Sequence, residues 1–204
     1  RLATAAIVYL LAWRRGTPGF RLIIVGIGVS AMLTAFNQWL VLEAELDAAI
    51  SAAIWGQGSL NGIRWEQAAP AALMLVPLIV AGLLLGRRLA ALDLGDDAAA
   101  ALGLRVERTR LLALLIGVGL TAVATAVAGP IAFVSLCAPQ LARRLVRAPG
   151  IALAPAALTG AFLLVASDFV AARAFAPIQL PVGVVTVSIG GIYLVYLLAK
   201  EARA

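Results

Sequence analysis

Long apolar runs, separated by short charged connections, set the strongest limit on how this chain folds. The runs cover residues 2–13, 21–42, 68–86, 111–128, 130–146, 151–172 and 180–199. A helix over 21–42 is about 33 Å long, enough to cross the hydrocarbon core of a bilayer. Charged residues make up 13% of the chain, whereas a soluble domain carries about 25%. We therefore predict an all-α polytopic membrane protein with seven membrane segments in one transmembrane domain, residues 1–204.

The start of the sequence indicates that this chain is part of a longer protein. The first apolar run, 2–13, is shorter than the roughly 20 residues that a membrane span needs. The chain begins at Arg1, with neither a methionine nor a charged leader followed by a cleavage site, so we expect no signal peptide. These features predict a C-terminal portion whose first helix is cut near its start.

The positive charges lie mainly on one set of connections. Every Lys and Arg other than Arg1, Arg64 and Arg173 lies in or beside the first, third and fifth connections or near the C-terminus. By the positive-inside rule these connections and the C-terminus are cytoplasmic. The net charge of +6 follows from this asymmetry, and we expect no nucleic-acid partner.

The cytoplasmic connection 87–110 is predicted to contain a short helix. Acidic residues over 93–97 supply its start, because carboxylates favour the first turn of a helix, and Gly103 ends it. Leu94, Ala98 and Leu102 are spaced i, i+4, i+8 and form one apolar stripe. The stripe either packs on the chain's own helices or enters a groove on a soluble partner.

The long outer connection, 43–67, is predicted to contain a second short helix over Ala48–Trp55, followed by the turn-forming GQGSLNG. Trp55 and Trp65 suit the membrane–water interface, where indole rings are favoured. The connection is either an ordinary loop with an aromatic belt or a helix that lines the mouth of a pathway.

The residues that enzymes and metal sites need are largely missing. The chain has no histidine and a single cysteine, Cys137, so we expect no disulfide framework, metal site or enzymatic activity. Asp168 is the one carboxylate near the end of a span. There are three alternatives: it has a role in function, it pairs with Arg173, or it caps a short outer helix. A secondary transporter is an alternative, but it lacks coupling acids in mid-span. We therefore prefer an external motor protein, acting on the connection 87–110, as the source of energy for transport.

The stretch GPIAFVSLCAPQLARR, Gly129–Arg144, places two prolines in one apolar segment. Gly129 and Pro130 predict a tight outer turn that opens a helix, because proline is tolerated in a first turn. Pro139 predicts a break partway along it. Arg143 and Arg144 predict a cytoplasmic anchor.

This stretch resembles the signature of the permeases that import iron-siderophores, haem and vitamin B12, the membrane subunits of type II ABC importers. ALDLGDDAAAALGL and LPVGVVTVSIGGIYLVYLL match the same family in the same order. The second of these, with WGQGSLNGIRWEQ, most resembles the ferric-enterobactin branch. Gln140 stands where family members usually have histidine.

The resemblance implies a ten-helix permease, of which this chain is the fourth through tenth helices, in the cytoplasmic membrane. It implies that two permease subunits, identical or paralogous, form the path. Two ATPase subunits carrying ATP-Mg drive the change, and a soluble binding protein delivers a ferric siderophore from outside. Haem or a corrinoid is the alternative substrate. This chain itself is expected to bind no cofactor and no metal.

The resemblance also implies four groups of site residues. The ATPase-coupling loop is Asp93, Leu94, Gly95, Asp96, Asp97, Ala98, Ala101, Leu102, Gly103 and Leu104. The family signature is Gly129, Pro130, Phe133, Pro139 and Arg143. The cytoplasmic gate is Thr17, Pro18, Gly19 and Phe20, and Arg64 and Arg173 are candidates for docking the binding protein.

Overall fold

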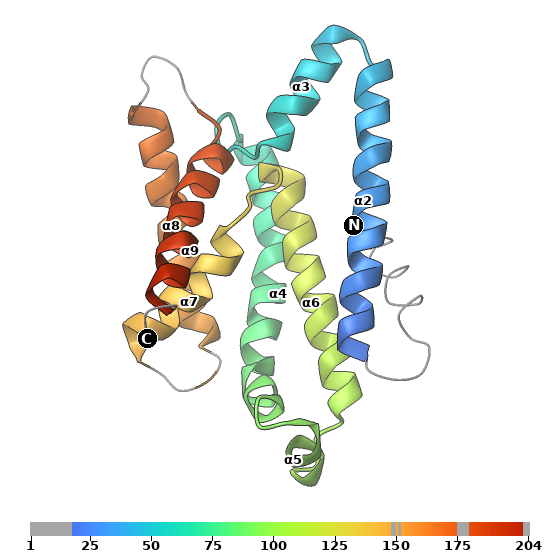
Figure 1. Cartoon of the computed structure of the whole chain (residues 1–204), viewed down its shortest axis with the longest axis vertical. Coiled ribbons are helices and arrows are strands. Elements are labelled where there is room, and N and C mark those ends of the chain that lie inside the picture. The colour runs from blue at the N-terminus through green and yellow to red at the C-terminus, as the bar shows by residue number, and fades with distance from the viewer. Residues whose placement is uncertain (1–17, 148–149, 151, 175–179, 202–204) are drawn as a thin grey trace. The chain divides into compact units, whose positions relative to one another are not determined.

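A computed structural model describes residues 18–147, 150, 152–174 and 180–201, and it contains no strand in these ranges. Its helices confirm the predicted all-α class (Figure 1). They are α2 (Pro18–Glu43), α3 (Leu46–Gly56), α4 (Trp65–Leu92), α5 (Asp96–Ala101), α6 (Val106–Ala128), α7 (Val134–Val146), α8 (Leu153–Arg173) and α9 (Val182–Glu201). Both predicted short helices are present, as α3 and α5.

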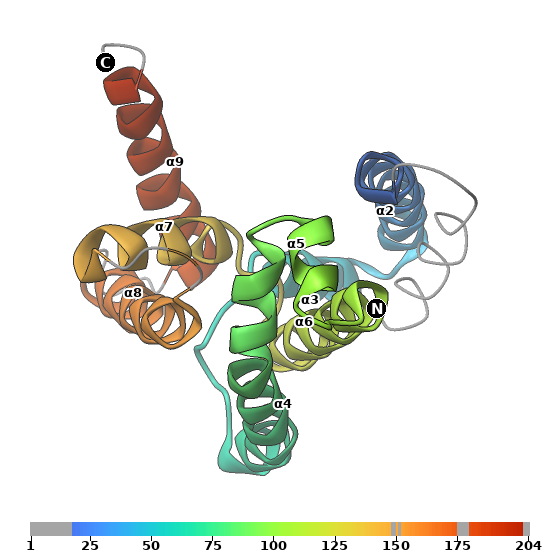
Figure 2. The ribbon, with the colours of Figure 1, turned by 90° about the horizontal axis from the view of Figure 1, so that it is seen from below.

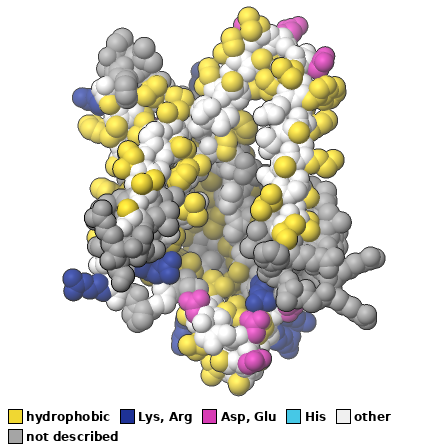
Figure 3. Space-filling view, in the orientation of Figure 1, with side chains coloured by type: hydrophobic (Ala, Val, Ile, Leu, Met, Phe, Trp, Pro, Cys, Tyr) yellow, Lys and Arg dark blue, Asp and Glu magenta, His cyan; other side chains and the backbone are white. Residues whose placement is uncertain are grey.

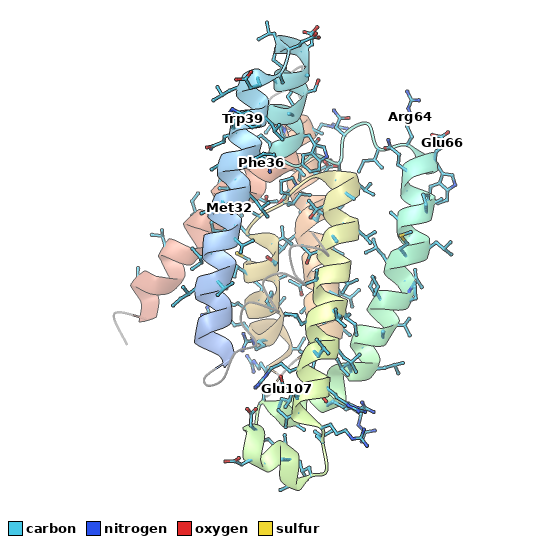
Figure 4. The ribbon with its side chains drawn as sticks, turned by 90° about the vertical axis from the view of Figure 1, so that its right-hand side faces the viewer. Met32, Phe36, Trp39, Arg64, Glu66 and Glu107 are labelled. Atoms are coloured by element: carbon cyan, nitrogen blue, oxygen red, sulfur yellow. The ribbon has the colours of Figure 1, made fainter. Side chains whose placement is uncertain are left out.

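The chain divides into two compact units, residues 1–54 and 55–204. In the first unit α2 begins at Pro18, because proline already has a helical φ and lacks only an N–H that a first turn leaves unpaired. Phe36 and Trp39 lie one turn apart on α2, with ring centroids 5.8 Å apart, and Met32 lies one turn before them (Figure 4). These three side chains are exposed within the described chain.

The second unit contains two groups of helices. One is the antiparallel pair α4 and α6, and the other is α7, α8 and α9 (Figures 1 and 2). Small residues let the helices approach closely. A Cβ on Gly119 of α6 would lie 3.2 Å from Leu78 Cδ1 of α4, and one on Gly160 of α8 would lie 3.4 Å from Ala138 Cβ of α7.

The helices of the second unit alternate in direction, so it has two distinct ends (Figure 1). The end of α4, the start of α6, the end of α7 and the start of α8 lie with α5 at one end, which we call the α5 end. The starts of α4 and α9 and the ends of α6 and α8 lie at the opposite end. This arrangement agrees with the predicted alternation of inner and outer connections.

Four described helices are long and apolar enough to cross a membrane: Ile24–Glu43 within α2, and α4, α6 and α8. The predicted number of membrane segments, seven, is larger than the four found among the described residues. Helix α7 has 13 residues and is about 20 Å long, too short to span. The apolar stretch described within α9 is Val182–Tyr193, and the predicted segment 2–13 lies outside the described residues.

Two predicted boundaries of the 87–110 connection were wrong. Helix α4 continues through Arg87 and Arg88 to Leu92, and α6 already begins at Val106. Arginine is a good helix former, so a drop in hydropathy marks the edge of the membrane and not the end of the helix. The true connection between α4 and α6 is residues 93–105.

The signature stretch also differs from its prediction. Gly129, with φ +72°, follows α6, and α7 begins at Val134 and not at Pro130. Phe133, the residue before α7, has φ +66°, so the backbone cannot continue a helix through it. Pro139 does not break α7, which runs through it to Val146. The missing N–H removes one hydrogen bond, and the neighbouring turns keep the helix intact.

Candidate functional site

Helix α4 ends in a compact turn that leads into α5. The amide of Asp93 donates to the carbonyl of Leu89 at 3.2 Å, and the amide of Gly95 donates to that of Leu92 at 3.1 Å. Gly95 is the N-cap of α5 and has φ +102°, which residues with a Cβ rarely adopt. The turn at Gly95 therefore makes α5 begin at Asp96, inside the predicted start over 93–97.

The C-terminal end of α5 is closed by a Schellman motif. Gly103 has φ +80° and donates its amide to the carbonyl of Ala100 at 2.9 Å. The amide of Leu104 donates to the carbonyl of Ala99 at 3.1 Å. These two bonds satisfy carbonyls that a helix end leaves free, which confirms the predicted stop at Gly103.

An ion pair joins α5 to α6. Arg110 Nη2 lies 3.0 Å from Asp96 Oδ1 and 3.2 Å from Asp96 Oδ2, across 14 residues of sequence. Both side chains are about half exposed, at 47% and 58%. The first turn of α5 is thus tied to the second turn of α6.

The predicted apolar stripe on α5 is not formed as a helical stripe, because Leu94 precedes the N-cap Gly95 and is not on the helix. Ala99 is the α5 residue that packs on the chain, with no exposed surface. Leu94 and Leu102 are 69% and 66% exposed. Two large apolar side chains therefore remain uncovered at the α5 end.

Three buried glycines meet at the opposite end, in a contact that the sequence analysis missed. Gly58 follows α3, Gly129 follows α6, and Gly183 is in the first turn of α9. A Cβ on Gly183 would clash with Gln57 O, and one on Gly129 would clash with Trp55 O. A Cβ on Gly58 would lie 2.7 Å from Pro130 O. Only glycine allows these backbones to touch, and we call this contact the glycine junction.

Backbone hydrogen bonds hold the glycine junction together. The amide of Ser59 donates to the carbonyl of Ala128 at 2.8 Å, and the amide of Gly183 donates to that of Gly58 at 3.0 Å. Turn motifs mark all three segments in the sequence, as GQG, GP and PVG. Those motifs indicate where the chain turns, but not that the turns meet.

A cavity of about 180 Å³ lies between α7, α8 and α9. Phe133 lines it, and a Cβ on Gly190 would lie 2.7 Å from Phe133 Cβ. Thr186 lines the cavity and donates its hydroxyl to the carbonyl of Gly183 at 2.9 Å. Among the described residues, Tyr193 Oη has no hydrogen-bond partner, although it is buried.

The signature residues do not form one site. Gly129 and Pro130 belong to the glycine junction, Phe133 lines the cavity, and Arg143 is exposed at the α5 end of α7. Gln140, in the usual histidine position, is half-buried on α7.

Both proposed docking arginines lie at the end opposite α5. Arg64 immediately precedes α4 and is exposed, and it extends away from the helix beside Glu66 (Figure 4). Arg173 is the last residue of α8, and its guanidinium lies 5.6 Å from the Phe169 ring, a cation–π contact. The pairing of Asp168 with Arg173 was wrong, because Arg110–Asp96 is the single ion pair in the described ranges.

The remaining predicted residues fall in two places. Pro18, Gly19 and Phe20 form the first turn of α2 and not a loop, and Thr17 lies outside the described residues. The part of the chain that the structure describes holds no group of three or more His, Cys, Asp or Glu that could bind a metal.

Comparisons with known proteins agree on one family. The family model of the FecCD transport family matches residues 1–200. The chain is 54% identical over 202 residues to the ferric enterobactin transport system permease protein FepG of Escherichia coli (strain K12), covering 99% of this chain and 61% of FepG. It is 40% identical to the probable siderophore transport system permease protein YfhA of Bacillus subtilis (strain 168), covering 99% and 59%. The chain thus spans about three fifths of the length of these relatives.

A solved structure has the same fold. It is a metal-chelate type ABC transporter in an inward-facing conformation, with a TM-score of 0.84 and 27% identity. The match covers 98% of this chain and 64% of the other. With the apolar helices, these comparisons indicate a multi-pass membrane protein.

Proposed function

Since the chain belongs to the FecCD transport family, we propose that it is the permease part of an ATP-driven importer that carries a ferric siderophore across the cytoplasmic membrane. The observation that carries this proposal is the 54% identity with the ferric enterobactin permease, over nearly the whole chain. The hemin permease HmuU of Yersinia pestis is 34% identical, which favours a siderophore over haem. Ferric enterobactin is therefore the first substrate to test.

The positive-inside rule orients the chain in this proposal. Arginines gather at the α5 end of the second unit, on the last turns of α4 and α7 and the first turns of α6 (Figure 3). Arg64 and Arg173 are the described arginines of that unit at the opposite end. The α5 end therefore faces the cytoplasm, as does the C-terminus.

The chain belongs to a family of transport permeases and is not itself an enzyme, and its α5 end has the features of a coupling surface for a separate ATPase subunit. Leu94 and Leu102 are exposed apolar side chains that a groove on a partner would cover. The turn at Gly95, the Schellman motif at Gly103 and the Arg110–Asp96 pair hold α5 to its neighbouring helices. A push on α5 would therefore be passed to α4 and α6.

The opposite end faces the soluble binding protein. Arg64 is exposed and Arg173 carries its charge at the end of α8, so both are placed to meet acidic residues of that partner. A second permease subunit, identical or paralogous, completes the transport path. Mg-ATP is bound only by the ATPase subunits.

The test uses the full-length permease with its ATPase subunits and binding protein in liposomes. We expect ferric enterobactin uptake that requires ATP, is blocked by vanadate and does not depend on an ion gradient. Leu94→Asp with Leu102→Asp is expected to reduce uptake by about tenfold or more, because a charge in an apolar groove is costly. Leu42→Asp with Leu46→Asp, two similarly exposed leucines in the segment where α2 ends and α3 begins, serves as the matched control.

Two results would overturn the proposal. One is uptake that follows an ion gradient and continues without ATP, as in a secondary transporter. The other is full uptake by the Leu94 and Leu102 variant, which would remove α5 from the coupling surface. Preference for haemin over ferric enterobactin would correct the substrate alone.

A further inference from the structure

The end of α7 presents three arginines close together. Arg143 and Arg144 lie in its last turn, and Arg147 is its C-cap with φ +50°. All three side chains are exposed. Leu145 and Val146, between them in sequence, are 71% and 52% exposed. We call these five residues the α7 basic end.

The three guanidinium groups have no protein partner among the described residues. The single ion pair in those ranges joins Arg110 to Asp96, and no described hydrogen bond involves the side chains of the α7 basic end. Three like charges within five residues repel one another, so an anion would stabilise this arrangement.

The position of the α7 basic end relative to the membrane follows from α8. That helix is long and apolar enough to span, and it starts at Leu153, six residues after Arg147. The α7 basic end therefore lies near the surface of the bilayer, on the same side as α5 (Figure 1). At this depth apolar side chains reach the acyl chains while arginine extends to the phosphate layer.

We propose that the α7 basic end binds the phosphate headgroup of an anionic phospholipid. Arg143, Arg144 and Arg147 contact the headgroup, and Leu145 and Val146 lie against the acyl chains. Guanidinium groups suit this ligand because they donate paired hydrogen bonds to phosphate oxygens. The site does not depend on what the permease transports.

Charge separates this site from the surface proposed for the ATPase. The α5 segment is acidic, with Asp96 and Asp97 in its first turn, whereas the α7 basic end carries only positive charge. The surface proposed for the ATPase also has the exposed Leu94 and Leu102, whereas the α7 basic end has no carboxylate that would compete with an anion for its arginines. The anionic leaflet fits the α7 basic end and not α5.

The experiment measures lipid retained by the full-length permease in complex with its ATPase subunits. The complex is reconstituted in nanodiscs of phosphatidylcholine with phosphatidylglycerol, released into detergent and analysed by native mass spectrometry. We expect bound phosphatidylglycerol to fall by about tenfold or more in the variant R143Q/R144Q/R147Q. The variant R143K/R144K/R147K is expected to keep most of the lipid, and free inorganic phosphate is expected not to displace it.

The matched control is R87Q/R88Q/R105Q, which removes the same charge at the same end of the unit. This control is expected to keep its bound phosphatidylglycerol. Equal loss in both triple variants would show a diffuse charge effect and overturn the site. Unchanged lipid with loss of the ATPase subunits in R143Q/R144Q/R147Q would assign the arginines to a protein contact and would also overturn it. Leu145→Ser is expected to weaken retention without any change of charge, and an unchanged melting temperature of that variant separates lipid binding from misfolding.

Discussion

Arg110 of α6 binds the carboxylate of Asp96 of α5, with Nη2 3.0 Å from Oδ1. This contact is the only described side-chain bond between the short helix α5 and the long helix that follows it. Because α5 has six residues, it cannot be stable alone, and such anchors decide its orientation.

Breaking this ion pair should impair coupling more than stability. Arg110→Gln and Asp96→Asn should each lower the free energy of unfolding by less than about 1 kcal/mol, because both side chains are half exposed. We expect fewer ferric siderophores moved per ATP hydrolysed in proteoliposomes. The charge swap D96R/R110D should recover part of that ratio, and a swap as poor as the single variants would argue against the ion pair.

Gly103→Ala should loosen the end of α5. With φ +80°, alanine at this position costs about 1 kcal/mol, and the Schellman hydrogen bonds weaken. We expect faster hydrogen exchange over residues 96–104 and a melting temperature lowered by only about 2–4 °C. Gly103→Asn is the control, because asparagine tolerates a left-handed conformation and should exchange like the wild type.

Gly183→Ala should destabilise the glycine junction. A Cβ there would clash with Gln57 O, so the first turn of α9 must move away from the loop. We expect a loss of about 1–3 kcal/mol, measured as a lower melting temperature of the purified permease. Gly191→Ala is the matched control on the same helix, since a Cβ there meets nothing within 4 Å. Equal melting temperatures for the two variants would contradict the packing described.

Tyr193→Phe should not destabilise the protein. The hydroxyl is buried without a partner among the described residues, and an unpaired buried polar group costs about 1–3 kcal/mol. Removing it should leave the melting temperature unchanged or raise it. Tyr193→Leu is the comparison, because it also removes ring volume from the cavity lining and should lower the melting temperature. A clear loss of stability in Tyr193→Phe would mean that the hydroxyl has a bonding partner.

Features that depend on one residue or on a few neighbouring residues were predicted well from the sequence. The stop of α5 at Gly103 depends on one residue with a left-handed φ, and glycine is the residue that adopts it readily. The long spans followed from hydropathy alone. The extension of α4 past Arg87 was missed because hydropathy reports the bilayer edge, whereas helix formation depends on backbone propensity.

Contacts between segments far apart in sequence could not be predicted from such local rules. The meeting of Gly58, Gly129 and Gly183 joins three segments far apart in sequence, and each looks like an ordinary turn by itself. The start of α7 was also missed, because the left-handed φ of Phe133 is unusual for a residue with a large side chain. Its ring packs on Gly190, a contact visible only in three dimensions.

The two ends of the second unit join its helix groups in different ways. At the glycine junction backbone hydrogen bonds connect the groups, and these bonds fix the orientation of the segments as well as their separation. At the α5 end, a Cβ on Gly86 of α4 would lie 3.3 Å from Leu153 Cδ1 of α8, an apolar contact that can slide. Helix α6 ends at the junction, has 23 residues and is about 35 Å long, so a rotation of about 5° there displaces its other end by about 3 Å. The two helix groups are therefore fixed to each other at the glycine junction and are in apolar contact at the α5 end, where they can move relative to each other.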